Sequence, residues 1–307
     1  MSHPVPTTPA DPDGPEPTGP EDAPDQVGRS GTATFLLVLA TGLAAGFLSG
    51  LFGVGGGLVI VPALMSVLGM SQRRAAATSL AAIVLTAAVG TGSYALRGEV
   101  SLVAAVLLVL GSLVGAQIGT WLLRRLPARV LPWIFVAFAL FVIVSQQLQV
   151  PVRDAGLVLD PLRGAGLVVV GLVAGVLSGL VGVGGGSVIV PGLELIVGVG
   201  DLLARGTSLL VMIPTAIMGT WSNARHGVVD LRAGLIVGVG AAVAAPLGTV
   251  TAAAISPATG NLLFSLFLVC VVLNTLRKER QRRRREQAAV ELALDGVPSD
   301  ASDDRRA

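Results

Sequence analysis

Charged side chains are scarce in this chain of 307 residues, because Asp, Glu, Lys and Arg together make up only 13% of it. A soluble globular domain carries about 25% charged residues. Hydrophobic residues reach 52%, and only 17 side chains between residues 33 and 276 are charged. This composition excludes a soluble globular protein and predicts a protein embedded in a membrane.

Cysteine and histidine are also scarce, which removes the side chains that most metal sites and thiol enzymes use. Cys270 is the only cysteine, so a disulfide within the chain is impossible. His226 is the only histidine between residues 33 and 276, and no cluster of His, Cys and carboxylates has the spacing of a metal site. An intramembrane serine protease would need a G-x-S-G element, but the stretch 46–50 has one residue too many. We therefore predict that the protein is not an enzyme and holds no metal.

Charge and proline gather at the two ends of the chain. Residues 1–32 are rich in Pro, Asp and Glu and contain no apolar stretch, so we predict a disordered tail and no signal peptide. Residues 277–307 begin with seven Lys and Arg side chains and continue with mixed charge. The basic run lacks aromatic residues for base stacking, so we expect it to face lipid headgroups and not nucleic acid.

Long apolar segments fill the chain between these tails. Eight of them reach or approach the roughly 20 residues that a membrane-spanning helix needs. They are residues 33–51, 75–96, 100–123, 130–149, 165–181, 206–223, 233–254 and 261–276. Two shorter pieces, 58–69 and 187–199, each follow a cluster of glycines, so we predict half-helices or re-entrant segments there. The predicted fold is an all-α polytopic membrane protein.

An internal repeat organises these segments. Residues 42–64 and 171–193 are identical at 18 of 23 aligned positions without a gap. The same offset of 129 residues pairs the Thr-Ser-Leu triplet at 78–80 with the triplet at 207–209. We therefore predict two homologous helical repeats in the membrane, since a duplicated unit folds into the same structure twice. The first repeat, the loop between the repeats and the second repeat are residues 33–149, 150–164 and 165–276.

The basic residues predict an orientation, because short cytoplasmic loops are enriched in Lys and Arg. The basic run at 277–285 places the C-terminus inside. The loop at 124–129 carries three arginines and is best placed inside too, yet its counterpart at 255–260 has no basic residue and falls outside. The two repeats are therefore predicted to be inverted, with both termini cytoplasmic. Five crossings per repeat, or three plus a re-entrant hairpin, both give the odd number that inversion requires.

Two glycine clusters precede the short apolar pieces. Residues 53–57 and 182–186 both read Gly-Val-Gly-Gly-Gly, without the Lys and Ser or Thr of a Walker A loop. Four glycines in five residues at membrane depth predict a broken helix whose free N–H groups face protein or a wet cavity. The half-helix that follows points its positive N-terminal end there, which suits an anion. The alternative is that these glycines, as we expect for Gly111, only allow close helix packing.

Together these elements resemble one family. The duplicated G-x-x-x-G-x-x-S-G-L-x-G-V-G-G-G-x-V-I-V-P element, the two Thr-Ser-Leu triplets and the later N-A-R-H-G-V-V-D at 223–230 are similar to the TauE/SafE sulfite exporters, the transmembrane sulfur-compound permeases. The resemblance covers about residues 33–276. It implies a polytopic transporter of sulfite, sulfoacetate or related small anions in the bacterial inner membrane, without a cofactor. One departure is that the first repeat has R-G-E at 97–99, where the second has H-G-V at 226–228.

Glycines, prolines and polar residues of these elements are the candidate ligands of the substrate. They are Gly53, Gly55, Gly56, Gly57, Pro62, Thr78, Ser79, Gly182, Gly184, Gly185, Gly186, Pro191, Thr207, Ser208 and Asn223. For the two Thr-Ser pairs, capping of the helices that they begin is the alternative to hydrogen bonding with the anion.

Ionisable residues in or beside the apolar segments are candidates for coupling transport to an ion. Glu194 is the one acid inside a predicted segment, and Met65 replaces it in the first repeat. Its alternative role is to reach the membrane interface. His226 is either a proton relay or a residue of an interfacial loop. Arg205 is expected in a loop outside the membrane, where Asp201 balances its charge.

The expected partners are therefore a small anionic substrate and the lipid bilayer, with a homo-oligomer left open and no nucleic acid. A passive anion channel, or a membrane partner of another protein that transports nothing itself, is the alternative to a transporter.

Overall fold

Ten α-helices make up the parts of the chain that the computed structural model describes, residues 31–127, 130–147 and 160–295. They are α1 (Gly31–Phe52), α2 (Gly57–Val67), α3 (Gln72–Ala95), α4 (Leu102–Arg125), α5 (Leu131–Gln147), α6 (Pro161–Val181), α7 (Gly186–Val197), α8 (Asp201–Ala224), α9 (Leu231–Ala254) and α10 (Pro257–Asp295). Seven of these helices are long and apolar enough to cross a membrane. The all-helical polytopic membrane fold is thereby confirmed.

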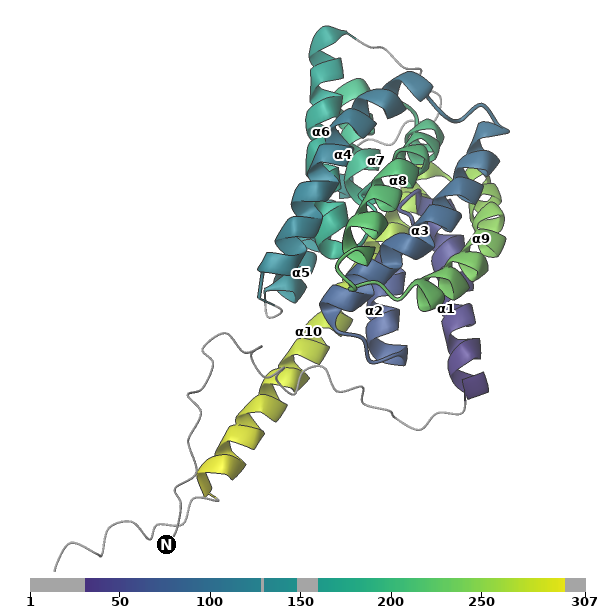
Figure 1. Cartoon of the computed structure of the whole chain (residues 1–307). Helices are drawn as coiled ribbons and strands as arrows, with labels where there is room; N and C mark the ends of the chain where they lie inside the picture. The colour runs from purple at the N-terminus through teal and green to yellow at the C-terminus, as the bar shows by residue number, and fades with distance from the viewer. Residues whose placement is uncertain (1–30, 128–129, 148–159, 296–307) are drawn as a thin grey trace, which may run out of the picture.

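Several helix boundaries differ from the expected segments. α5 has 17 described residues and belongs with α2 and α7 among the shorter apolar helices; residues 148 and 149, the end of the segment that the sequence predicts at 130–149, lie outside the described residues. α10 does not end at residue 276 but continues through the basic run to Asp295, and Figure 1 shows this end leaving the helix bundle. Residues 1–30 and 148–159, where the sequence predicts the acidic tail and most of the loop between the repeats, lie outside the described residues.

The helix boundaries repeat along the chain. α3 and α8 have 24 residues each and begin and end 129 residues apart, and the same holds for α4 and α9. α1, α2 and α5 correspond in the same way to α6, α7 and the first part of α10. The structure therefore contains two repeats of five helices.

The two repeats interlock. α1 of the first repeat packs along α9 of the second, and α6 of the second packs along α4 of the first. α3 and α8 cross in the middle of the bundle, between these two pairs (Figure 1). Each repeat therefore buries its long helices mainly against the other repeat.

Glycines allow the outer pairs of helices to approach closely. A Cβ atom at Gly111 of α4 would lie 2.0 Å from the carbonyl oxygen of Val168 in α6, and one at Gly46 of α1 would lie 1.9 Å from that of Ala241 in α9. No side chain fits at such distances, so the backbones of the paired helices touch, as small residues permit in membranes. The expected packing role of Gly111 is confirmed.

The contacts between α3 and α8 fix their relative direction. Gly90 in α3 lies against Leu209 near the start of α8, and Leu80 near the start of α3 lies against Gly219. The residue numbers rise in one helix as they fall in the other. α3 and α8, which match each other in the repeat, therefore run antiparallel.

The outer surface of the bundle is apolar as well. α4 exposes Val106, Leu110 and Val114, and α9 exposes Val239 and Val243. Spacings of four residues place such side chains on one face of each helix. An apolar outer face suits contact with lipid, not with water.

Candidate functional site

Each repeat contains a broken helix. α1 ends at Phe52 and α2 begins at Gly57, while α6 ends at Val181 and α7 begins at Gly186. Three glycines in each break have the left-handed backbone conformation, which glycine adopts without steric cost. Their φ angles are 69° for Gly53, 78° for Gly55, 77° for Gly56, 75° for Gly182, 90° for Gly184 and 80° for Gly185. The predicted breaks are therefore present in both repeats.

The two breaks are in contact with each other. A Cβ atom at Gly57 would lie 2.5 Å from the carbonyl oxygen of Gly182, and one at Gly186 would lie 2.5 Å from that of Gly53. Gly57 and Gly186 are the first residues of α2 and α7. The N-terminal ends of both short helices therefore meet where the two repeats touch.

Met212 of α8 fills the space between the breaks. A Cβ atom at Gly55 would lie 1.9 Å from the Cε methyl carbon of Met212, and one at Gly184 would lie 2.0 Å from it. Ile83 of α3, which matches Met212 in the repeat, borders the same space. Both side chains are fully buried. In this conformation the breaks therefore face a methyl group.

Two serines, one at each break, connect the breaks to the opposite repeats by hydrogen bonds. The Ser79 hydroxyl in α3 donates to the carbonyl oxygen of Gly182, and the Ser208 hydroxyl in α8 donates to that of Gly53 at 3.0 Å. Both serines are fully buried. A helix end leaves backbone carbonyls without partners, so these hydroxyls stabilise the breaks in the observed conformation.

The threonines beside these serines bind the loops that precede α4 and α9. The N–H of Ser101 donates to Thr207 Oγ1 at 3.0 Å, and the N–H of Asp230 donates to Thr78 Oγ1 at 3.0 Å. α3 begins at Gln72, so Thr78 lies in its second turn and does not cap its own helix. The same holds for Thr207 in α8.

A proline lies in the middle of each short helix, Pro62 in α2 and Pro191 in α7. Proline has no N–H to donate to the carbonyl group four residues earlier. In these helices that carbonyl belongs to Leu58 and Ser187, one residue after each helix start. The helical hydrogen bonding is therefore incomplete next to both breaks.

A family profile matches both repeats. The profile described as Sulfite exporter TauE/SafE matches residues 14–145 and 167–298. The chain belongs to the TauE/SafE family. This family assignment agrees with the resemblance carried by the glycine clusters and the Thr-Ser-Leu triplets.

Several relatives are described as probable membrane transporter proteins. One from Haemophilus influenzae is 30% identical over 267 residues, which cover 79% of this chain and 98% of that protein. YunE of Bacillus subtilis is 28% identical over 241 residues, which cover 70% of this chain and 87% of YunE. No solved structure matches the chain. The chain is thus a membrane transporter of the TauE/SafE family and not an enzyme.

Asn223, near the end of α8, carries a buried amide without hydrogen bonds. Its side chain is fully buried, and neither Nδ2 nor Oδ1 has a partner. The first repeat has Tyr94 at the matching position, and the Tyr94 hydroxyl donates to the carbonyl oxygen of Gly50 at 2.7 Å. A buried amide without partners costs about 1–3 kcal/mol. Asn223 is therefore available to bind a polar ligand.

The two candidates for ion coupling lie in different surroundings. Glu194 in α7 is half-buried, and its Oε2 atom is buried without a hydrogen-bond partner. It is within electrostatic reach of Arg205 and Asp201 in α8. His226 is exposed in the turn after α8, and its Nδ1 atom lies 2.7 Å from the carbonyl oxygen of Ser222. The structure does not bring His226 together with the buried breaks.

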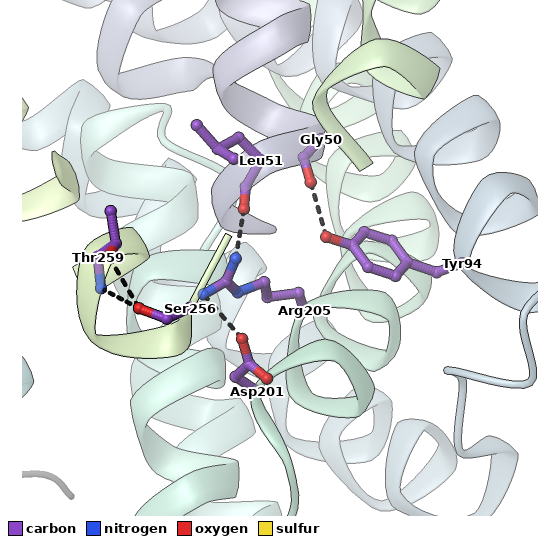
Figure 2. A network of polar contacts seen from close by, with 7 residues as sticks. All are labelled: Gly50, Leu51, Tyr94, Asp201, Arg205, Ser256 and Thr259. Carbon is purple, nitrogen blue, oxygen red and sulfur yellow. Dashed lines mark hydrogen bonds and ion pairs between the residues drawn. The ribbon is translucent and has the colours of Figure 1, made fainter. Parts of the chain in front are cut away.

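Arg205 is a buried residue of α8, which corrects the expectation that it lies in an outside loop. α8 begins at Asp201, five residues before the predicted segment, so both residues of the ion pair are helical. Arg205 Nη2 lies 3.2 Å from Asp201 Oδ2, and the side chains are 3% and 1% exposed. Figure 2 shows the pair beside the last turn of α1 and the Tyr94 hydroxyl. Its sequence signal is the spacing of four residues between opposite charges at the edge of an apolar segment.

Proposed function

We propose that this transporter moves small sulfur-containing oxyanions, sulfite or an organosulfonate such as sulfoacetate, across the bacterial inner membrane. The meeting of two half-helix N-termini carries the proposal. Each helix N-terminus has a partial positive charge of about half an elementary charge and N–H groups that point outward. Two such ends in contact favour an anion between them.

Hydrogen-bond donors are present at both ends. The N–H groups of Val59 and Val188 are the first that α2 and α7 use, each bonding to the capping glycine, and the N–H groups before them have no acceptor in their own helix. Ser187 adds a buried hydroxyl without a partner in the first turn of α7. Ser79 and Ser208 stand beside the breaks and complete the proposed site with the glycines.

We further propose that the repeats are inverted in the membrane, with both termini in the cytoplasm. The antiparallel course of α3 and α8 supports this, because these helices match each other in the repeat. Inverted repeats place the substrate near the middle of the membrane, where the two halves meet. We propose that the contact between the breaks is this place.

The packing around Met212 favours a transporter over an open channel. Its methyl group lies where side chains at Gly55 and Gly184 would clash with it, so the methyl group occupies the space between the breaks in this conformation. An anion can enter only after Met212 moves, which couples binding to a change of conformation.

Flux measured in proteoliposomes tests the proposed function. The panel contains sulfite, sulfate, thiosulfate and sulfoacetate, each with and without a proton or sodium gradient. We expect selective flux of one sulfur-containing anion that responds to a gradient. Flux that ignores both gradients would favour a passive channel, and absence of flux for the whole panel would contradict the proposal.

A further inference from the structure

Asp201 and Arg205 form an ion pair in an unfavourable place. They are the only fully buried charged residues in the described part of the chain. Both belong to a helix that is apolar enough to cross a membrane. Removing two charges from water costs several kcal/mol each in practice, and apolar side chains of similar size often do as well. A buried pair of this kind is weak evidence for a purely structural role, and an ionisable group in a membrane helix is by default functional.

The guanidinium of Arg205 lies at the entrance to the first break. Its Nη1 donates to the carbonyl oxygen of Leu51 at 2.7 Å, two residues before Gly53. A Cβ atom at Gly53 would lie 2.6 Å from Arg205 Cβ, and one at Gly260 in the first turn of α10 would lie 3.0 Å from Nη2. Figure 2 shows the guanidinium between the end of α1 and Asp201, with the Tyr94 hydroxyl nearby.

The second break, between α6 and α7, shows that a break does not need this pair. Gln72 and Ala76 occupy the positions in α3 that match Asp201 and Arg205 in α8. Ala76 packs against Gly182 as Arg205 packs against Gly53, and the two glycines have similar φ angles of 75° and 69°. Since the same backbone forms beside a methyl group, the charges of the pair are not required to build it.

We propose that Arg205 binds the transported anion directly, and that Asp201 occupies its guanidinium when no anion is present. The inference rests on the proposed function and names a further binding residue for that transport. The guanidinium now holds one carbonyl oxygen and one carboxylate oxygen. A sulfite or sulfonate group presents two oxygens to a planar guanidinium in the same way as a carboxylate. The anion therefore replaces Asp201, whose charge the N-terminal end of α8 stabilises after the exchange.

Variants of the full-length protein test the exchange, with sulfite as the probe. The first readout is the sulfite concentration that gives half of the maximal rise in unfolding temperature in detergent, and the second is the concentration dependence of flux in liposomes. Asp201→Asn removes the competing charge at nearly constant size, so the half-saturating concentration falls about tenfold or more. Arg205→Gln raises it by a similar factor.

A matched control removes a different helix-start ion pair. Asp160→Asn breaks the exposed pair between Asp160 and Arg163, whose atoms lie 3.5 Å apart, and asparagine still caps α6. Half-saturation is unchanged in this variant. Arg205→Lys keeps the ion pair and the charge but loses the planar donor pair, so we expect its half-saturating sulfite concentration to rise. This variant still tests the inference if the Asp201→Asn protein fails to insert into the membrane.

The outcomes separate the inference from the proposed function. If the ion pair is only structural, Asp201→Asn lowers the unfolding temperature without lowering the half-saturating sulfite concentration. This result would overturn the inference. Unchanged half-saturation in Arg205→Lys, or no stabilisation by sulfite in the wild type and Asp201→Asn alike, would overturn it too. Stabilisation that follows the prediction without any flux would leave the inference standing and contradict transport of sulfite.

Discussion

Alanine substitution at the capping glycine of each short helix should impair transport more than alanine at the other end of the same helix. Gly185 is the N-cap residue of α7 and has a φ of 80°, and Gly198 is its C-cap residue and has a φ of 75°. A Cβ atom at Gly185 would lie 2.8 Å from the carbonyl oxygen of Ala174, whereas a Cβ atom at Gly198 would have no neighbouring atom within 4 Å. An alanine would therefore meet similar backbone strain at the two positions, but only at Gly185 would its methyl group lack space.

The magnitudes follow from these two terms. A left-handed conformation costs alanine about 1–2 kcal/mol relative to glycine at either position. The contact with the carbonyl oxygen of Ala174 adds about 1–3 kcal/mol at Gly185, because a backbone group must move to accept the methyl. We therefore expect Gly185→Ala to destabilise the protein by about 2–5 kcal/mol and Gly198→Ala by about 1–2 kcal/mol.

The first repeat offers the same comparison independently. Gly56 caps α2 with a φ of 77°, and a Cβ there would lie 2.9 Å from a carbonyl oxygen of α1; Gly69 after α2 has a φ of 63° and open space. Gly111 is not a suitable control for these variants, because a Cβ atom there would clash with the backbone of α6.

The assay measures unfolding temperature in detergent and flux in proteoliposomes at equal amounts of inserted protein. We expect Gly56→Ala and Gly185→Ala to lose most of their flux, with Gly69→Ala and Gly198→Ala close to the wild type. Equal losses within each pair would contradict this prediction, since backbone strain alone would then explain the effect and close approach at the breaks would play no part.

Three further predictions concern other parts of the chain. Ser79→Ala and Ser208→Ala each leave a buried glycine carbonyl without its donor, so each should lower stability by about 1–3 kcal/mol and slow flux; a neutral result at both sites in thermal unfolding would contradict the role of these bonds. Single cysteines at Arg125 and Pro257, in a background without the native cysteine, should label from opposite sides of the membrane, and labelling from one side would exclude inversion. Truncation after Glu286 should leave flux intact, because the basic run before it stays in place to hold the helix end at anionic lipid with about 1 kcal/mol per basic residue; loss of flux in a correctly inserted truncation would assign the distal end a part in transport.

Local patterns predict most of the fold. Apolar length gives the long helices, and the duplicated motif gives the repeat and both breaks, because positive φ angles at Gly53 and Gly182 depend on neighbouring residues. α10 is longer than the sequence predicts. Hydrophobicity predicts only the part of a helix that lies in lipid. It therefore misses the rest of α10, which continues as a helix beyond its apolar part to Asp295.

The site is less predictable, because its contacts join distant parts of the chain. The sequence singles out Ser79 but not its acceptor, the carbonyl oxygen of Gly182, 103 residues away. The sequence predicts a loop at Arg205 because Gly198, Gly200 and Asp201 interrupt the apolar pattern before it. Burial of Arg205 results from packing against α1 and α10, which no local pattern contains.

Differences between the repeats lie beside the shared breaks and give them unequal surroundings. At the first break a phenol and a guanidinium, from Tyr94 and Arg205, bond to the last turn of α1. At the second, the matching residues are Asn223, whose amide has no partner, and Ala76. If the two repeats exchange roles during transport, an anion meets the guanidinium of Arg205, which is paired with Asp201 in this conformation, at one break and a neutral amide at the other. The first break should then hold the anion more tightly, and the side of the membrane that this break serves decides whether tight binding precedes or follows the crossing.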